Sequence, residues 1–116
     1  MANDKIYNMS FAKVYPLLVA KAEKKGRTGD EVDEVTSWLT GYSKEQIADC
    51  LANGKTYGDF FLNAPALNPK RKLITGKICG INLEEIDESL MQEIRYLDKL
   101  VDELAKGRPM EKILRK

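Results

Sequence analysis

The clearest pattern in the chain is an apolar stripe in its last third. The stripe steps by four, three, four and three residues through Leu90, Ile94, Leu97, Val101 and Leu104. Residues three and four apart share one face of an α-helix, so this spacing predicts a long amphipathic helix. We expect this helix to begin near Asp87 and to end at Gly107, with Pro109 opening a last helical turn.

The first apolar segment, FAKVYPLLVAKAEKKG, follows Ser10, a residue type that caps helices. Its apolar positions again recur at helical spacing. Pro16 lies past the first turn, where proline removes a backbone hydrogen bond. The pattern therefore predicts a helix that is either kinked at Pro16 or begins only near Tyr15.

Two further helices are marked by capping boxes, in which the cap side chain and the third helical side chain each accept a backbone N–H. Thr28 has this spacing with Glu31, and Ser43 has it with Gln46. Thr56 can cap a further short helix that carries aromatic residues and ends before the next proline. The pattern predicts short helices joined by short turns.

The stretch NAPALNPKRK, residues 63–72, is mainly a connector. Asn68 followed by Pro69 is typical of a helix start, because asparagine caps and proline fits the first turn. The following segment is rich in β-branched residues but is interrupted by Gly76 and Gly80. We therefore expect at most one short extended segment or hairpin near residues 73–83.

These elements together predict an all-α or mostly α fold, a small bundle of short helices in a single globular domain spanning residues 1–116. The length of 116 residues suits one domain with a core of its own. The residues expected in that core are Val14, Leu18, Val35, Trp38, Leu39, Leu51, Phe60, Leu97, Val101 and Leu104.

Charge and targeting signals narrow the class of protein. The 19 basic and 18 acidic residues nearly cancel, which argues against a nucleic-acid or membrane binder driven by net charge. The longest apolar run, residues 15–20, is too short to cross a bilayer. The first ten residues lack the apolar core of a secretion signal, so we expect a cytoplasmic location and reduced Cys50 and Cys79.

The chain contains no histidine, and this absence excludes several kinds of chemistry. Imidazole-based triads and the usual zinc sites are ruled out, so we expect no metal and no cofactor. Cys79 has no histidine to activate it as a nucleophile. The acidic residues at 84–88 match the positive end of the following helix better than they match a metal site.

The candidate binding site is a basic cluster in a segment, residues 60–83, that contains no acidic residue. Cationic side chains beside a helix start suit phosphate groups. Nearby aromatic residues would then stack on single-stranded bases, or else they belong to the core. The candidate ligand-binding residues are Asn68, Lys70, Arg71, Lys72 and Lys77, and we assign no catalytic residue.

Two other patterns allow different interpretations. Segments 31–39 and 44–52 have the length of a helix-turn-helix, but packed helix pairs with a glycine turn are far commoner than DNA-reading pairs. The stripe at 90–104 packs either inside its own chain or, together with the rest of residues 90–116, against a second copy in a homodimer.

Several strings resemble one small bacterial family, the domain of unknown function number twenty-two hundred. They are YNMSFAKVYPLLVAKAEKKGRT, WLTGYS, APALNP and MQEIRYLDKLVDELAKG followed by MEKILRK. The resemblance covers nearly the whole chain and implies a single, mainly helical domain with helices packed at steep angles. It carries no activity, ligand or catalytic residue. Glu88 and Ser89 stand where the family pattern has an acid followed by proline.

The functional expectation is a non-catalytic binding or interaction protein of the bacterial cytoplasm. It would bind a phosphate-containing ligand through residues 57–77. Nucleic acid is one such ligand, although the near-neutral charge does not favour it. The alternatives are a small histidine-independent enzyme acting on a phosphorylated metabolite and a regulatory adaptor that docks a protein through the long helix.

Overall fold

A computed structural model of the chain describes residues 4–78, 80–86 and 88–114. Cys79 and the expected helix cap Asp87 lie outside the described residues. The elements in chain order are α1 (Asp4–Tyr7), α2 (Phe11–Glu23), α3 (Gly29–Thr40), α4 (Lys44–Ala52), α5 (Tyr57–Leu62), the 3-10 helix η1 (Pro69–Leu73), β1 (Lys77–Ile78), β2 (Ile81–Asn82), the 3-10 helix η2 (Leu83–Glu85), α6 (Ser89–Ala105) and α7 (Met110–Ile113).

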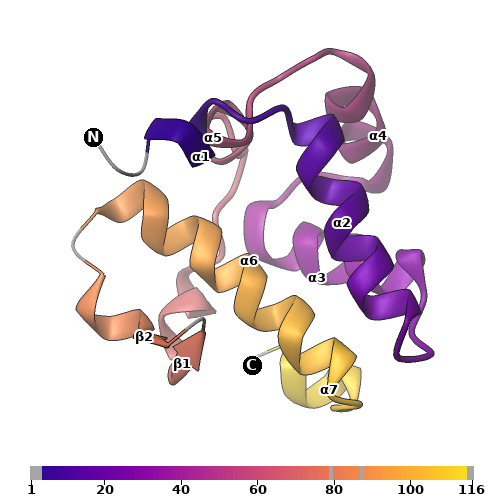
Figure 1. Cartoon of the computed structure of the whole chain (residues 1–116), viewed down its shortest axis with the longest axis vertical. Helices are drawn as coiled ribbons and strands as arrows, with labels where there is room; N and C mark the ends of the chain where they lie inside the picture. Colours follow the sequence, from indigo (N-terminus) through magenta and orange to yellow (C-terminus); the bar gives the residue numbers. More distant parts are fainter. Residues whose placement is uncertain (1–3, 79, 87, 115–116) are drawn as a thin grey trace.

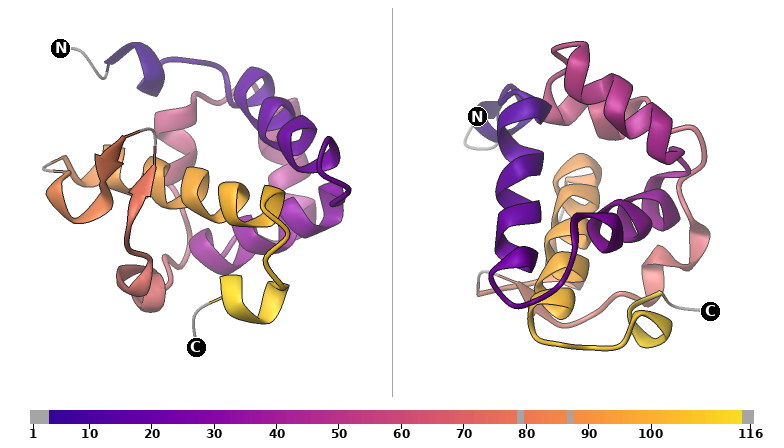
Figure 2. Two further views of the ribbon diagram at one scale, coloured as in Figure 1. Left: turned by 60° about the horizontal axis from the view of Figure 1, so that its bottom comes forward. Right: turned by 90° about the vertical axis from the view of Figure 1, so that its right-hand side faces the viewer.

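The fold is mostly α, as the sequence predicts, and it is organised around α6 (Figure 1). Helices α2, α3 and α5 pack against α6, and so do β1 and η2. In the right-hand view of Figure 2, α3 runs across α2 and α6 instead of alongside them. The short α7 folds back onto the end of α6.

Both capping boxes form. The Thr28 hydroxyl accepts the Glu31 backbone N–H at 3.2 Å, and the Glu31 carboxylate accepts the Thr28 N–H at 3.0 Å. Ser43 and Gln46 make the same reciprocal pair at 3.1 and 2.8 Å. Each box satisfies two N–H groups that would otherwise lack a partner, so the starts of α3 and α4 are set by local sequence.

Of the two alternatives for the first long helix, the start near Tyr15 is wrong, because α2 begins at Phe11. The Phe11 N–H donates to the Lys55 carbonyl at 2.9 Å, and Ser10 pairs with Thr56 in an isolated β-bridge. The Phe11 side chain is fully buried. Tertiary contacts thus fix the first turn, while Pro16 sits inside the helix on its exposed side.

The extended segment expected near residues 73–83 is a two-stranded antiparallel hairpin, in which Lys77 pairs with Asn82 and Ile78 with Ile81. Gly80 in the turn has φ +79°, a value that favours glycine. An isolated hairpin this short is marginal in water. Here α6 supports it, because the Lys99 ammonium donates to the Lys77 carbonyl at 3.1 Å.

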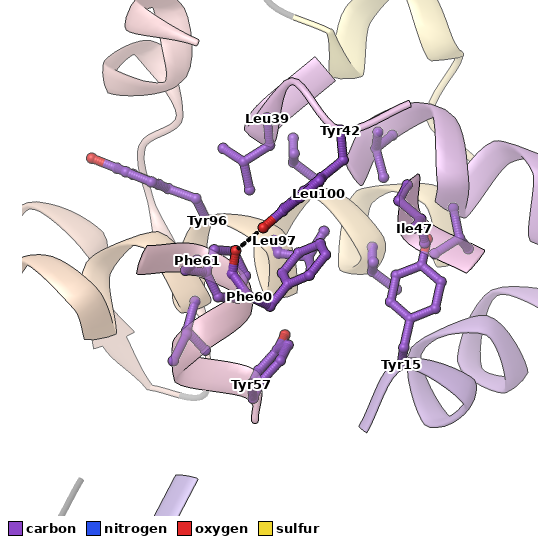
Figure 3. Packing of buried hydrophobic residues seen from close by; sticks show 14 of the residues in the cluster. Tyr15, Leu39, Tyr42, Ile47, Tyr57, Phe60, Phe61, Tyr96, Leu97 and Leu100 are labelled. Atoms are coloured by element: carbon purple, nitrogen blue, oxygen red, sulfur yellow. Dashed lines mark hydrogen bonds between the residues drawn. The ribbon is translucent and has the colours of Figure 1, made fainter. Parts of the chain in front are cut away.

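An aromatic cluster fills the core between α2, the α3–α4 turn and α5 (Figure 3). The Phe60 ring stacks on Phe11 with centroids 4.1 Å apart and on Tyr42 at 4.5 Å. The Tyr42 hydroxyl donates to the Phe60 carbonyl at 2.7 Å. The Tyr57 hydroxyl is buried and has no hydrogen-bond partner among the described residues.

Most of the expected core is buried. The fully buried members are Val35, Leu39, Phe60, Leu97, Val101 and Leu104. The partly buried members, which pack against this core from its edge, are Val14, Leu18, Trp38 and Leu51. Periodicity places a residue on the apolar face of a helix, but the neighbouring elements decide how far that face is covered.

We expect Leu97→Ala to lower the free energy of unfolding by about 2–5 kcal/mol, because a fully buried leucine loses its contacts and leaves a cavity. The matched control is Leu62→Ala, since Leu62 is 69% exposed and should change stability by less than about 0.5 kcal/mol. Urea denaturation measures both. Equal losses would contradict the placement of α6 at the centre of the core.

The two core tyrosines should respond differently to loss of the hydroxyl. Tyr42→Phe breaks the bond to the Phe60 carbonyl and should cost about 1–2 kcal/mol. Tyr57→Phe removes a buried hydroxyl without a partner and should be neutral or stabilising by up to ~1 kcal/mol. Urea denaturation of both variants checks this; a loss at Tyr57 as large as that at Tyr42 would show that its hydroxyl is bonded.

Candidate functional site

The connector that carries the candidate residues is docked on the α3–α4 turn. The Ala66 N–H donates to the Thr40 carbonyl and the Asn68 N–H to the Leu39 carbonyl, both at 3.0 Å. Gly41 has φ +82°, and a Cβ there would lie 2.7 Å from the Ala66 side chain. Only glycine allows the turn and the connector to approach this closely, and this approach fixes where the following η1 begins.

Asn68 is a helix cap, as its sequence context predicts. Its side-chain oxygen accepts the Lys70 backbone N–H at 2.9 Å, which opens η1. This interaction uses the Asn68 carbonyl oxygen within the chain itself. Asn68 therefore sets the start of the basic segment, and its side-chain oxygen is already used for that purpose.

Arg71 differs from the other basic residues of the cluster, because it is paired with a carboxylate. Its Nε lies 2.9 and 2.8 Å from the two carboxylate oxygens of Glu93, and its Nη1 donates to the Asn68 carbonyl at 2.9 Å. The Arg71 and Glu93 side chains are only 18% and 10% exposed. The Arg71 charge is thus matched inside the protein, where it ties η1 to α6.

Lys72 and the backbone of Lys77 lie against one side of α6. The Lys72 ammonium lies 3.4 Å from the Gln92 side-chain oxygen and 5.9 Å from the centroid of the Tyr96 ring. Lys99 bonds the carbonyl of Lys77. Positions 92, 96 and 99 follow the i, i+4, i+7 spacing of one helix face, so these contacts extend over about 10 Å of α6.

We call Lys70, Lys72, Lys77 and Lys99 the lysine row. Lys99 is part of it only through the fold, because it follows Lys77 by 22 residues in the chain. The side chains of Lys70, Lys72 and Lys77 are exposed, and within the described residues no carboxylate oxygen lies within 4 Å of their ammonium groups. Lys70, Lys72 and Lys77 therefore keep their positive charge available to a ligand.

The lysine row has some acidic surroundings. Burial raises the pKa of the Tyr96 hydroxyl, the Glu93 and Glu84 carboxylates raise it further, and Arg71 lowers it. Glu93 is already matched by Arg71, whereas Glu84 is exposed beside the hairpin. Glu84 therefore offsets part of the positive charge of the row.

The proposed stacking role of the aromatic residues next to the cluster is wrong. Tyr57, Phe60 and Phe61 are each 2% exposed or less, and they pack against one another and against Phe11. Their rings belong to the core shown in Figure 3 and cannot meet a base. The buried alternative was open from the sequence, but only the packing of α5 against α6 decides between the two.

An open cavity of about 590 Å³ lies between α2, α3 and α4, away from the lysine row. Its apolar lining includes Pro16, Val19 and Leu51. Its ionisable lining residues are Tyr15, Glu23, Asp30 and Asp33. We call it the acidic cavity. Sequence reasoning missed it, because its three carboxylates come from two helices and have no distinctive spacing.

Tyr15 fixes one carboxylate of the acidic cavity. Its hydroxyl donates to Asp33 at 2.6 Å and lies 3.1 Å from the Thr36 hydroxyl. Burial raises the pKa of Tyr15 far above its usual value, and the hydrogen bond to Asp33 raises it further. Tyr15 therefore stays protonated as a donor at every physiological pH and cannot act as a general base there.

Three other expectations can be compared with the structure. Over the described ranges, no group of three or more Cys, Asp or Glu side chains is placed to hold a metal ion. In the same ranges, no helix is long and apolar enough to cross a membrane. In the α3–α4 pair, Lys44 forms an exposed ion pair with Asp30 and Gln46 completes a capping box, so both side chains already have partners within the chain.

We expect Arg71→Met to cost about 3 kcal/mol of unfolding free energy, because it leaves the Glu93 carboxylate uncompensated in a mostly buried site. The double variant Arg71→Met/Glu93→Leu should cost less than the sum of the two single changes. Lys70→Met is the control and should change stability by less than about 0.5 kcal/mol. If Arg71→Met behaved like the control in urea denaturation, Arg71 would rejoin the ligand-binding candidates.

Comparison with known proteins agrees with the fold and leaves the ligand open. A family model described as "Uncharacterized protein conserved in bacteria (DUF2200)" matches residues 5–115. A solved structure described as "Crystal structure of uncharacterized protein SP1917" is 56% identical, covers 98% of this chain and 93% of its own, and superposes with a TM-score of 0.93. No curated protein matches the sequence. Because the family model spans nearly the whole chain, the chain belongs to this family of uncharacterised proteins conserved in bacteria.

Proposed function

We propose that this protein is a non-catalytic binding protein of the bacterial cytoplasm that takes a phosphate-containing ligand on the lysine row. The observation that carries the proposal is the availability of Lys70, Lys72 and Lys77, which are exposed and have no carboxylate within 4 Å among the described residues. Lysine is a mobile point charge that binds phosphate without a fixed geometry. Nucleic acid and smaller phosphorylated compounds both present such groups.

Two interactions attach the backbone around the row to α6. The ion pair of Arg71 with Glu93 holds η1 on α6, and the bond from Lys99 to the Lys77 carbonyl holds the hairpin on the same helix. A fixed backbone lowers the entropy lost when the exposed lysines close on a ligand. Arg71 therefore contributes as a positioning residue for the lysine row.

The enzymatic alternative draws less support from the site geometry. An enzyme acting on a phosphorylated metabolite needs a pocket with cationic or neutral ionisable groups that meet the phosphate. The acidic cavity offers Glu23, Asp30 and Asp33 instead, and these would repel it. The lysine row lies elsewhere, away from this cavity.

Docking of a partner protein or a second copy through the long helix also draws little support. The α6 stripe is used inside the chain, since Leu97, Val101 and Leu104 are fully buried there. The α7 residue Ile113 is buried as well. A homodimer through residues 90–116 stays a prediction, and it would have to use the polar outer side of these helices.

The cytoplasmic part of the proposal rests on chemistry that suits a reducing compartment. Cys50 is a free, buried thiol on α4, and burial raises the pKa of its thiol. A thiol that stays protonated and buried is unreactive. Free buried cysteines of this kind are typical of proteins in reducing compartments.

Fluorescence-anisotropy titrations with labelled single-stranded RNA, single-stranded DNA and duplex DNA test the proposal at low and physiological salt. The variant is Lys70→Ala/Lys72→Ala/Lys77→Ala, which leaves the structural Arg71 in place. We expect binding by the native protein that weakens with salt, by about 0.9 in log–log slope per cationic contact on duplex DNA, and we expect it to be lost in the triple variant.

The matched control is Lys13→Ala/Lys24→Ala/Lys25→Ala, which removes the same charge from exposed lysines on and just after α2. It should bind like the native protein. Equal weakening by both triple variants would show that only net charge matters. Absence of binding at low salt to every nucleic-acid probe and to a labelled oligophosphate would reject the lysine row as a phosphate site.

A further inference from the structure

The acidic cavity is separate from the lysine row and has the opposite charge. We propose that it binds an organic cation, namely an ammonium group carried on an apolar stem. The proposal does not depend on the function of the lysine row, and the two can fail separately.

The size and lining of the cavity suit such a ligand. Its volume of about 590 Å³ falls within the range of small-molecule sites in proteins. Pro16 and Val19 of α2 and Leu51 of α4 provide apolar lining. A hydrocarbon stem placed against these side chains removes apolar surface from water, which favours binding by about 25 cal/mol per Å².

The charge of the lining selects a cationic head group. Asp30 is paired with Lys44, but Glu23 and Asp33 have no ion-pair partner among the described residues. Lys44 also acts electrostatically on Asp33, but this single ammonium faces three lining carboxylates. The net negative lining repels an anion, and a neutral apolar molecule adds no counter-charge to it. An ammonium group gains from both Glu23 and Asp33.

One of these carboxylates is held in place before any ligand arrives. The Tyr15 hydroxyl donates to only one Asp33 oxygen, Oδ1. Tyr15 itself is 2% exposed and is anchored by the core, so the hydrogen bond orients Asp33 at the cavity lining. A carboxylate that is already ordered loses little conformational entropy on binding.

The helix ends at the cavity do not reverse this selection. Glu23 is the last residue of the 13-residue α2, and helix carboxyl ends favour cations. The amino end of α3 also borders the cavity, but the Thr28–Glu31 capping box satisfies two of its N–H groups and Asp30 in its first turn offsets its positive partial charge.

The first test compares three probes with one stem and different head groups. Hexylamine, hexanol and hexanoate are titrated at pH 7 into the ¹⁵N-labelled protein, and the amide shifts of Gly29, Asp33 and Leu51 are followed. We expect hexylamine to bind more than about tenfold tighter than either other probe, because two partly exposed ion pairs each contribute about fivefold. Hexylamine binding should weaken as the sodium chloride concentration is raised, because salt screens its attraction to the carboxylates.

The second test removes the charges one at a time. Glu23→Gln and Asp33→Asn should each weaken hexylamine binding by about fivefold. Glu23 is exposed and makes no hydrogen bond or ion pair with another described side chain, so its variant tests the cavity without a risk to folding. Glu34→Gln is the matched control, since Glu34 is exposed on α3 beside Asp33 but does not line the cavity.

Two sources can supply the same head group, and further titrations distinguish them. Tighter binding of spermidine than of Nα-acetyl-lysine methylamide assigns the cavity to a free polyamine, and the reverse assigns it to the lysine of a peptide. Hexanol or hexanoate binding as well as hexylamine would overturn the proposal. The proposal would also be overturned if Glu34→Gln weakened binding as much as Glu23→Gln, or if hexylamine shifted none of the three amides.

Discussion

The burial of α6 is the constraint on which the rest of the structure depends. Of its side chains, Leu97, Leu100, Val101 and Leu104 are fully buried. Burying a helix on nearly every apolar position requires partners on several sides, and α2, α3, α5, α7 and the hairpin provide them. Because α3 crosses α2 and α6, short helices are enough to close the core (Figure 2).

The same helix also organises the polar residues at its surface. Glu93 lies one turn from Leu97 and recruits Arg71, so the cost of placing a carboxylate near the core is offset by a two-oxygen ion pair. A neighbouring face of α6 carries Gln92, Tyr96 and Lys99, which contact the basic segment and the hairpin. The lysine row is thus a consequence of how η1 and β1 rest on α6.

Positive and negative side chains are separated over the surface of the molecule, although its net charge is near neutral. Cationic side chains gather on the side of η1 and the hairpin, while the carboxylates Glu23, Asp30 and Asp33 gather between α2, α3 and α4. A formal net charge of +1 therefore hides two local fields of opposite sign. Local fields, more than the total charge, decide which ligands approach each surface.

The sequence by itself determined the features that depend on neighbours within a few residues. The two capping boxes, the Asn68–Pro69 start of η1, the amphipathic α6 and the short extended segment near residues 73–83 all follow local rules of capping, spacing and turn chemistry. The mostly α class follows from the same rules, and the family from the strings of residues that it shares with this chain.

Only the tertiary structure decided which residues meet across the fold. The sequence grouped Arg71 with three lysines, but Glu93, 22 residues away, removes it and Lys99 takes a place beside Lys77. The Lys55 carbonyl sets the start of α2, and the packing of α5 buries the aromatic residues. Local spacing carries no information on such long-range contacts, because they arise only when distant helices cover one another's apolar faces.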